Sequence, residues 1–528
     1  MSDEDDLKAR AHAALALLEE LATQLPRLAE LDEDLRIKLV TAAGQLSRPD
    51  RYSRKALGKV LARQRVKARR EADRAILDQT GIRTLRREPV FRTPLPKPTW
   101  TALDAPIRDD EGEDAWAAAE ARREEGPEME RAEPAMKVET ARLCYVCKTE
   151  FHDLHFFYDQ LCQPCAELNY RKREQTADLR RRVVLVTGAR VKIGYQAAVL
   201  LLRAGAEVIV ATRFPRDAAR RYGGEPDATD WMHRLHVYGI DLRHTPSVEM
   251  LARHLLTTQS RLDGIINNAC QTVRRPAGWY DHVVRDESEP PQTAFERVVL
   301  ERNRALLGSS SPQLALTASG DPIKAVGLWK SAVLSQVPLL AEDLERGNHL
   351  YPQGRLDQDL QQVDMRDFNS WRMTLADVPT AELFEVHLVN AIAPFVLNAR
   401  LRPLLAAVPT RDAHVVNVSA MEGQFYRRWK TDKHPHTNMA KAALNMMTRT
   451  SAADYVRDGI HMNSVDTGWV TDEDPQHHAA RKQEIHGFHP PLDIVDGAAR
   501  IVDPIFDGIN TGTHLWGLFL KDYKPAPW

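Results

Sequence analysis

The sequence predicts an α/β protein in which helices cover both faces of a doubly wound parallel sheet. Strand-like runs such as Val183–Val186 and Glu207–Ala211 alternate with helical runs, a pattern typical of that fold. The first strand leads directly into a glycine-containing turn, Thr187–Gly194, where helix amides can cradle a phosphate group. Four cysteines between Cys144 and Cys165 predict a small separate module ahead of the sheet.

Length and composition favour a soluble protein of several domains. A chain of 528 residues is too long for one ordinary core, so two or three domains are expected. The formal net charge of -2 argues against a protein that is basic overall, which makes nucleic acid an unlikely main partner. The sequence shows no apolar run that approaches a membrane span, and Met1–Asp6 is acidic, unlike the start of a secretory signal. We expect a cytoplasmic location.

The first region, residues 1–139, is predicted to be helical and charged. Apolar residues recur at helical spacing from Leu7 to Leu46, with Asp32 as a cap for a second helix. The prolines of Arg87–Trp100 indicate an extended linker. The charged stretch Asp109–Glu133 is expected to be a tether or one solvated helix.

A third helix is predicted from about Ser53 to Gln79, ending at Gly81. It is strongly basic, with Arg54, Lys55, Lys59, Arg63, Arg65, Lys67, Arg69 and Arg70. Such a helix could lie along a phosphate backbone, where cationic side chains release counterions. The simpler interpretation is a solvated helix face, which we favour.

The cysteines form two Cys-x-x-Cys pairs, Cys144 with Cys147 and Cys162 with Cys165, separated by fourteen residues. A tetrahedral Zn²⁺ needs four soft ligands brought together in such pairs, so residues 140–178 are predicted to be a structural zinc module in a reducing compartment. Four thiolates close the coordination shell, which argues against catalysis at this metal. The knuckle, hairpin, knuckle and helix resemble treble-clef zinc modules. His152 and His155 are alternative ligands.

The remaining region, residues 179–528, carries a series of landmarks in order. They are the Thr187–Gly194 turn, Asp241 after a third strand, Asn267-Asn268-Ala269-Cys270 after a fourth, Asn390, Lys441, and the loop Asn463–Thr471. Together they resemble the short-chain dehydrogenase/reductase family, whose members have a Rossmann domain that binds a dinucleotide. The resemblance implies a cofactor site formed by Thr187, Gly188, Arg190, Lys192, Ile193, Gly194, Arg213, Asp241, Asn267, Ala269 and Lys441.

Charge near the turn predicts the form of the cofactor. The second strand ends at Arg213, and the first carboxylate after it is Asp217, whereas an unphosphorylated ribose would call for an acidic residue at the strand end. Arg190 and Lys192 add positive charge nearby, so NADP(H) is predicted over NAD(H). The alternative is that Lys192, which replaces a family glycine, blocks the pyrophosphate and leaves the site empty.

The catalytic positions depart from the family pattern. Counting back four residues from Lys441 gives Thr437 in place of the family tyrosine, and Ala420 stands at the family serine. Ser419 lies one residue early, on the opposite face of the strand if the register holds. Tyr426 could supply the phenol that the family tyrosine would otherwise provide. Glu422 and His436 are further candidates for proton transfer. The predicted catalytic set is therefore Lys441, Asn390, Tyr426 and Ser419.

An insertion at about residues 271–380 separates Cys270 from Asn390. Helical patterns are predicted at Ala294–Leu307 and at Val333–Leu344, the second interrupted by Pro338. Because the insertion leaves the carboxyl end of a strand, it should lie beside the cofactor crevice as a lid, a subunit interface or a binding surface. Two of its tryptophans, Trp279 and Trp371, are expected to be packing anchors.

Two functions of different classes remain open. The first is an NADP(H)-dependent oxidoreductase with a rearranged acid/base group, acting on an unknown small-molecule carbonyl or alcohol. The second is an inactive dinucleotide sensor or scaffold that presents the zinc module, or the insertion, to a protein partner or to a second copy of the chain. The loss of the family serine and tyrosine favours the second, while Asn390, Lys441 and the coherent cofactor site favour the first.

Overall fold

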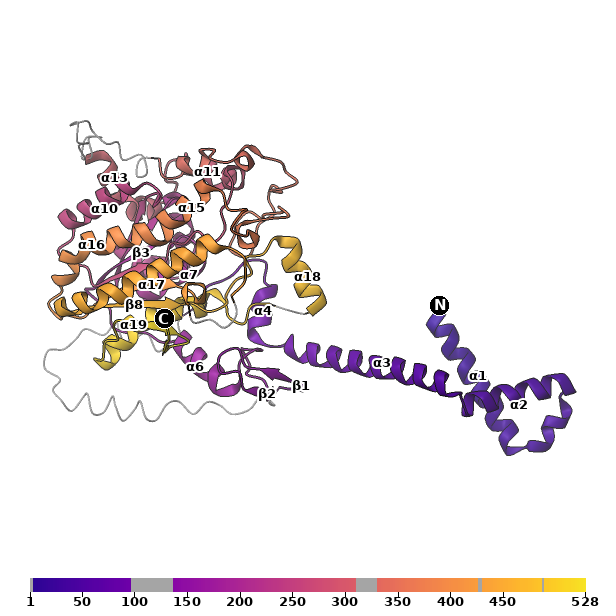
Figure 1. The fold of residues 1–528 in the computed structure, drawn as a ribbon. Helices are drawn as coiled ribbons and strands as arrows, with labels where there is room; N and C mark the ends of the chain where they lie inside the picture. Colours follow the sequence, from indigo (N-terminus) through magenta and orange to yellow (C-terminus); the bar gives the residue numbers. More distant parts are fainter. Residues whose placement is uncertain (1–2, 96–135, 310–329, 426–429, 487–488) are drawn as a thin grey trace. The chain divides into compact units, whose positions relative to one another are not determined.

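The computed structural model describes residues 3–95, 136–309, 330–425, 430–486 and 489–528 (Figure 1). The chain divides into two compact units, Met1–Arg74 and Ala75–Trp528. The first unit contains α1 (Asp3–Thr23), a 3-10 turn (Leu25–Glu30), α2 (Glu33–Ser47) and most of α3 (Arg51–Leu77). The Asp32 carboxylate accepts a hydrogen bond of 2.8 Å from Leu35 N, which confirms this residue as the α2 cap. All ten Lys and Arg side chains of α3, the eight named above together with Arg51 and Arg74, are exposed. The stretch 109–133 lies outside the described residues.

The second unit begins earlier than the predicted boundary at residue 139. Leu77 and Ile82, the latter in α4 (Gly81–Arg87), share one apolar core with the cysteine module. Backbone amides of Gly81 and Ile82 donate to Phe156 O and Phe157 O. The described part of the predicted linker is also held in place, since Phe91 N donates to Gln358 O. Residues 75–95 therefore belong with the second unit. Burial of Ile82 and its neighbours holds this segment in place, although the prolines that follow it indicated an extended linker.

The cysteine module consists of a hairpin and a helix. Strand β1 (Lys137–Leu143) pairs with β2 (Glu150–Asp153) in an antiparallel hairpin whose turn carries the first cysteine pair. The second pair opens α6 (Gln163–Arg173), as predicted. The hairpin surrounds the first cysteine pair, whereas the predicted order placed it between the two pairs.

An eight-stranded sheet forms the centre of the second unit. Its strands are β3 (Val183–Thr187), β4 (Glu207–Thr212), β5 (Leu235–Gly239), β6 (Gly264–Asn267), β7 (Ala413–Ser419), β8 (Ile460–Asp466), β9 (Phe519–Lys521) and β10 (Lys524–Ala526). They lie in the order β10-β9-β8-β7-β6-β3-β4-β5, parallel except for the β9–β10 pair. Because the strand order reverses between β3 and β6, a ligand crevice is expected at their carboxyl ends. The predicted fold class is confirmed.

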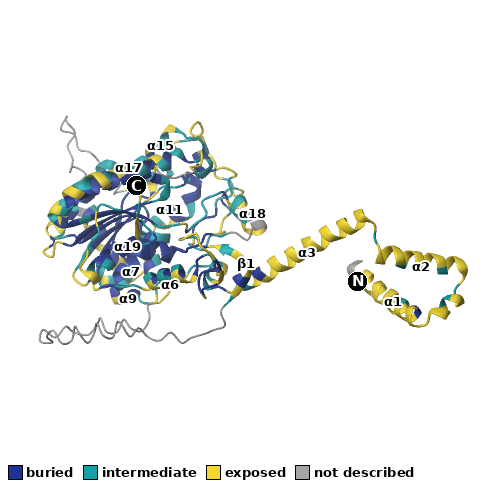
Figure 2. Ribbon diagram, turned by 60° about the horizontal axis from the view of Figure 1, so that its bottom comes forward, coloured by how far each residue is buried: buried dark blue, intermediate teal, exposed yellow. Residues whose placement is uncertain are grey.

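Helices cover both faces of this sheet. On one side lie α7 (Lys192–Arg203) and α19 (Ile494–Thr511), and on the other α10 (Thr245–Thr258), α16 (Ala393–Ala406) and α17 (Pro435–Tyr455). Figure 2 shows the strands buried between these layers. Peripheral helices are α8 (Pro215–Gly223), α9 (Ala228–Trp231) and α18 (Gln476–His486).

One helical stretch among the described residues, Thr380–Ala406, is long and apolar enough by length and composition to cross a membrane. This differs from the expectation drawn from the sequence, where the apolar run appeared too short. Half of its most apolar window is buried inside the protein, and α16 within it packs on the sheet, as the core helix of a globular domain does. The stretch is therefore weak evidence for a membrane span.

The insertion folds as a lobe of short elements. The predicted helix 294–307 is two helices, α12 (Ala294–Val299) and α13 (Glu301–Ser309), separated at Leu300. The predicted helix 333–344 is two 3-10 turns on either side of Pro338, because proline cannot continue the helical hydrogen bonds. The lobe also contains α11 (Asp281–Glu287) and leads into α15 (Thr380–His387). Its aromatic core includes Trp279, Tyr280 and Tyr351 and packs against Phe214 at the end of β4.

Candidate functional site

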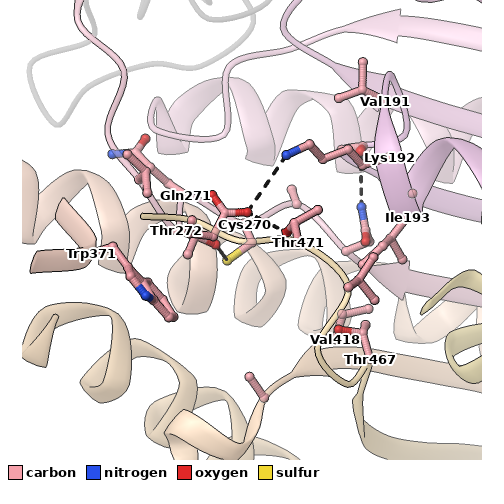
Figure 3. A pocket seen from close by; sticks show the side chains of 18 of the residues that line it. Val191, Lys192, Ile193, Cys270, Gln271, Thr272, Trp371, Val418, Thr467 and Thr471 are labelled. Atoms are coloured by element: carbon pink, nitrogen blue, oxygen red, sulfur yellow. Dashed lines mark hydrogen bonds and ion pairs between the residues drawn. The ribbon is translucent and has the colours of Figure 1, made fainter. Parts of the chain in front are cut away.

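A cavity of about 1140 Å³ lies at the carboxyl ends of the parallel strands. Its walls come from the turn after β3, the ends of β4 to β8, the insertion, and the first cysteine knuckle (Figure 3). Most of the predicted cofactor residues line it, namely Gly188, Arg190, Lys192, Ile193, Gly194, Arg213, Asp241, Ala269 and Lys441. The sheet topology therefore brings together residues from across the chain at the switch point.

The turn after β3 depends on two glycines. Gly188 has a φ of 67°, and a side chain there would meet Ala269 Cα at 2.7 Å. A Cβ on Gly194 would meet Gly188 O at 2.6 Å and would also overlap the Asn268 amide. Asn268 Nδ2 donates to both Thr187 O and Gly188 O, so its side chain closes the turn. Neither glycine can be replaced without opening this turn.

Lys192 occupies the position of the missing family glycine and keeps its conformation. Its φ is 55°, in the left-handed region where glycine is favoured, so the backbone there is strained. The side chain extends toward Glu473 in the loop after β8, with Nζ 3.9 Å from Oε1, and about a third of it is exposed (Figure 3). Burial acts to lower the pKa of Lys192, but Glu473 and neighbouring carboxylates raise it. The ammonium group is thus charged and aimed across the cavity.

The two arginines near the turn differ in their surroundings. Arg190 is buried and already paired, with Nη1 2.6 Å from Asp217 Oδ2 and Nη2 donating to Gln361 Oε1. Arg213 donates to Tyr280 Oη at 2.7 Å, and its guanidinium lies 4.8 Å from the Tyr280 ring centroid. The Asp217 charge beside the cavity is neutralised by Arg190, whereas Arg213 is oriented mainly by an aromatic ring.

The other predicted cofactor residues have structural contacts. Thr187 Oγ1 accepts from Ala269 N at 3.1 Å and ties the ends of β3 and β6 together. Asn267 does not line the cavity, since its buried side chain donates to Asn398 and Asn417. Asp241 lines the cavity and accepts hydrogen bonds from Arg243.

Among the predicted catalytic residues, Ser419 and Lys441 reach the cavity and Asn390 does not. Ser419 is buried, and its Oγ has no hydrogen-bond partner among the described residues. Lys441 Nζ donates to Val418 O at 2.7 Å. Asn390 Oδ1 instead accepts from Gln271 N at 2.7 Å and holds the start of the insertion. Tyr426 lies outside the described residues.

Neither Thr437 nor His436 faces the cavity. Both are buried, and His436 Nε2 lies 3.2 Å from Glu382 Oε1. The suggestion that His436 transfers protons at this site is therefore wrong, because its position on α17 directs the ring into the protein. Glu422 does line the cavity.

His434 lines the cavity, although the sequence patterns did not identify it as a site residue. It precedes α17, with a φ of 42°, and its ring stacks on Trp371 at a centroid distance of 3.8 Å and an angle of 7°. Nδ1 lies 3.1 Å from Asn438 Oδ1, which can accept its proton and leave Nε2 with a lone pair. Burial lowers the pKa of His434 to about 4. The sequence offered one indication of this: His434 lies seven residues before Lys441, a spacing of two helical turns that puts both residues on one face of a helix.

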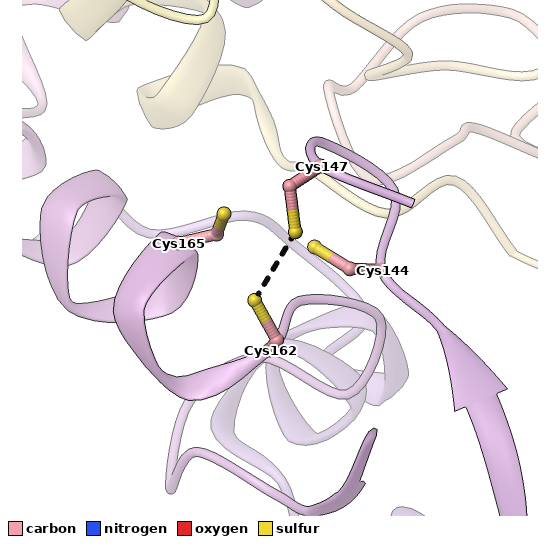
Figure 4. Close-up of side chains that lie close together, drawn as sticks. All are labelled: Cys144, Cys147, Cys162 and Cys165. Atoms are coloured by element: carbon pink, nitrogen blue, oxygen red, sulfur yellow. Dashed lines mark hydrogen bonds between the residues drawn. The ribbon is translucent and has the colours of Figure 1, made fainter. Parts of the chain in front are cut away.

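The four module cysteines converge (Figure 4). Their sulfur atoms all lie within 4.8 Å of one another, and Cys147 Sγ is 3.5 Å from Cys162 Sγ. Four thiolates around one zinc at 2.3 Å would be about 3.8 Å apart, so this set fits a tetrahedral Zn²⁺. Hydrogen bonds occupy the alternative ligands elsewhere, since His155 Nδ1 accepts from Phe157 N and His152 Nδ1 lies 3.0 Å from Val138 O.

The first cysteine knuckle also forms part of the cavity wall. Tyr145, between Cys144 and Cys147, lines the cavity, and its hydroxyl accepts from Trp469 N at 2.9 Å. Trp469 lies in the loop after β8, next to Gly468. The hydrogen bond between Trp469 N and the Tyr145 hydroxyl therefore links the cysteine module to a loop that borders the cavity.

Two family profiles match this part of the chain. Residues 182–290 match the short chain dehydrogenase family, and residues 365–489 match a profile described as enoyl-(acyl carrier protein) reductase. A related protein of Acanthamoeba polyphaga mimivirus, itself uncharacterized, is 30% identical over 400 residues, which is 74% of this chain and 76% of the relative. The domain belongs to the short-chain dehydrogenase/reductase family. The gap between the two matched segments falls within the insertion.

Other relatives share shorter or more distant similarity with the dehydrogenase domain. Retinol dehydrogenase 14 of Mus musculus is 35% identical over 99 residues, or 17% of this chain and 29% of the relative. The NADPH-bound carbonyl reductase from chicken fatty liver is 18% identical, with 66% of this chain and 100% of that chain covered and a TM-score of 0.38. RhlG of Pseudomonas aeruginosa with NADP is 18% identical, covers 65% and 95% of the two chains, and has a TM-score of 0.39.

Removal of one module cysteine should destabilise the dehydrogenase domain. We expect Cys144→Ser to bind no zinc at the cysteine cluster and to unfold at a lower temperature, because structural zinc contributes folding free energy, about 10–16 kcal/mol in isolated zinc fingers. Cys144 is buried in the core that the module shares with α19. Zinc content and thermal unfolding measure the effect. Cys270→Ser, at an exposed cysteine outside the cluster, should retain both the metal and the stability; equal zinc content in the two variants would contradict the assignment.

Proposed function

We propose that this protein is an NADP(H)-dependent oxidoreductase in which His434 replaces the family tyrosine as the proton-transfer group. The observation that carries the proposal is the cavity itself, where His434, Ser419 and Lys441 meet the phosphate-binding turn. The substrate is a small molecule with an alcohol or carbonyl group.

Charge around the turn supports the phosphorylated cofactor. Arg213 at the end of β4 and Lys192 in the turn both line the cavity and present positive charge to it. Asp217, the nearest carboxylate after β4, is neutralised by Arg190 and would repel a 2'-phosphate less than a free acid. When bound, NADP(H) supplies the hydride acceptor or donor, held by Gly188, Ile193 and Lys441 among others.

The protonation state of His434 favours a particular role. With a pKa of about 4, its imidazole is uncharged at neutral pH and accepts a proton through Nε2. In alcohol oxidation His434 Nε2 would accept the hydroxyl proton of the substrate, and bound NADP⁺ would supply the acceptor for the C–H hydride, so that the product is a carbonyl compound. Ser419 lines the cavity, but its Oγ is fully buried and unpartnered among the described residues, so the side chain must rotate before it can hydrogen-bond a substrate oxygen.

The test starts with extraction and identification of the dinucleotide from the purified chain, followed by hydride-transfer assays on a panel of alcohols. We expect His434→Gln to lower kcat by about 100-fold to 10,000-fold, the usual contribution of a general base, without changing NADPH affinity. In the wild type, kcat for oxidation should stay level as the pH falls to about 5 and decline below about pH 4, because His434 then becomes protonated.

The matched control is His233→Gln, at an exposed histidine outside the cavity, which should behave as wild type. Unchanged kcat in His434→Gln would refute the role of His434. The Tyr426 prediction is tested in the same assays with Tyr426→Phe. Absence of any dinucleotide binding would refute the proposal as a whole.

A scaffold or sensor is the second candidate, and one observation favours it. Ala420 and Thr437 replace the family serine and tyrosine, and Thr437 is buried away from the cavity. In this case the protein binds NADP(H) without turnover and presents the zinc module or the insertion to a protein partner or to a second copy of itself. NADPH binding together with no turnover across the alcohol and carbonyl panel would favour this candidate over the enzyme.

A further inference from the structure

Three histidines lie close together at the amino-terminal ends of the strands, opposite the cavity. His414 is the second residue of β7, His461 is the second residue of β8, and these two positions pair directly in the parallel register. His514 comes from the segment between α19 and β9. One ring nitrogen of each histidine lies within 4.8 Å of the others. The cavity lies at the carboxyl ends of the same strands, so the two sites are separate.

Hydrogen bonds and short distances around the rings indicate which ring nitrogens are free to bind a metal ion. His461 Nδ1 lies 3.2 Å from Ala413 O, and a carbonyl oxygen only accepts, so Nδ1 holds the proton and Nε2 keeps its lone pair. Metal-binding histidines commonly donate the N–H of their other ring nitrogen to a carbonyl oxygen or a carboxylate in this way. His414 Nε2 and His514 Nδ1 are 3.0 Å apart. Two nitrogens bound to one tetrahedral zinc at 2.0–2.1 Å would be about 3.4 Å apart, which requires only a small movement.

The helix beneath the rings leaves space for them. Gly508 of α19 faces the cluster, and a Cβ there would meet His514 Nδ1 at 2.6 Å and His414 Nε2 at 3.2 Å. The close approach of bare backbone allows the imidazoles to converge.

His414 is itself almost fully buried, and its Nδ1 has no hydrogen-bond partner among the described residues. Burial lowers the pKa of all three histidines, so they are uncharged at neutral pH, the form that binds a metal. Asp412 is held by two hydrogen bonds from Arg182, and the charges of this pair act on His414 with opposite signs.

We propose that His414, His461 and His514 form a second metal site that binds a divalent transition-metal ion such as Zn²⁺. Imidazole ligands suit zinc, copper and nickel rather than magnesium or calcium. Three protein ligands leave a fourth position for water, unlike the closed shell of the four cysteines. This site is independent of the proposed dehydrogenase activity.

The test counts metal ions on the full-length, untagged chain. The protein is stripped with chelator, reloaded with Zn²⁺ and dialysed, and the bound zinc is measured. We expect two ions per wild-type chain, one in His514→Ala and one in Cys144→Ser. With Co²⁺ as the probe, the cysteine site gives thiolate charge-transfer absorption and the histidine site does not, so the spectrum identifies which site each variant has lost.

The affinity of the second ion gives a sharper criterion. Loss of an outer-shell partner costs about 10-fold to 100-fold in metal affinity, so loss of the His514 ligand should weaken the second Zn²⁺ by more than about 100-fold. His461→Gln provides an independent variant if His514→Ala is unstable, and His233→Gln, at an exposed position, is the control that should retain two ions. A wild-type chain that holds only one ion, or variants that hold as many ions as wild type, would overturn the proposal.

Discussion

Gly194→Ala should weaken NADPH binding by more than 100-fold if the turn after β3 holds the pyrophosphate, an expected loss of about 2.7 kcal/mol or more. The added Cβ would lie 2.6 Å from Gly188 O, far inside the distance that any Cβ tolerates, and would overlap the Asn268 amide. The turn must open to accept it, and the amides at the start of α7 then no longer converge on a phosphate.

Titration of NADPH by calorimetry or fluorescence measures this effect, and thermal unfolding shows whether the domain remains folded. Gly58→Ala is the matched control, because a Cβ at this helical position meets nothing within 4 Å and alanine is a better helix former. Equal NADPH affinity in Gly194→Ala and wild type would show that the cofactor does not bind at this turn, and the proposed function would fail with it.

Arg173→Met should destabilise the second unit by about 3–5 kcal/mol, the usual cost of removing one partner from a buried ion pair. Arg173 extends from α6 of the cysteine module and contacts Asp493 through both terminal nitrogens, at 2.5 and 2.7 Å, and Asp496 at 3.1 Å. Asp493 is the N-cap of α19 and accepts from Val495 N and Asp496 N. All three charged side chains are buried, so two carboxylates would lose their main counter-charge at once.

Urea unfolding measures the change in free energy. Arg171→Met in the same helix is the control and should cost much less, because Arg171 is exposed. The double variant Arg173→Met/Asp496→Asn should recover part of the loss by removing one unpaired charge. If Arg173→Met and Arg171→Met were equally stable, the ion pairs would not be what fastens the cysteine module to α19.

The fold and the cysteine cluster followed from local patterns in the sequence. Alternating strand and helix periods predicted the parallel sheet, and the Cys-x-x-Cys spacing predicted a cluster that the structure brings together. Local patterns failed where tertiary packing decided the outcome. Burial of Ile82 placed residues 75–95 with the second unit rather than the first. The interruption at Pro338 lies where the sequence predicted it, although the flanking segments are 3-10 turns rather than α-helix.

The sequence by itself determined the α/β class, the family, the cysteine cluster and the glycine turn, because each depends on neighbours within a few residues or on a fixed spacing. Only the tertiary structure decided that Tyr145 of the cysteine knuckle borders the dehydrogenase cavity, that His434 rather than His436 faces it, and that His414, His461 and His514 meet. These contacts join residues that are up to several hundred positions apart. Their proximity arises from strand order and helix packing, which no short-range periodicity encodes.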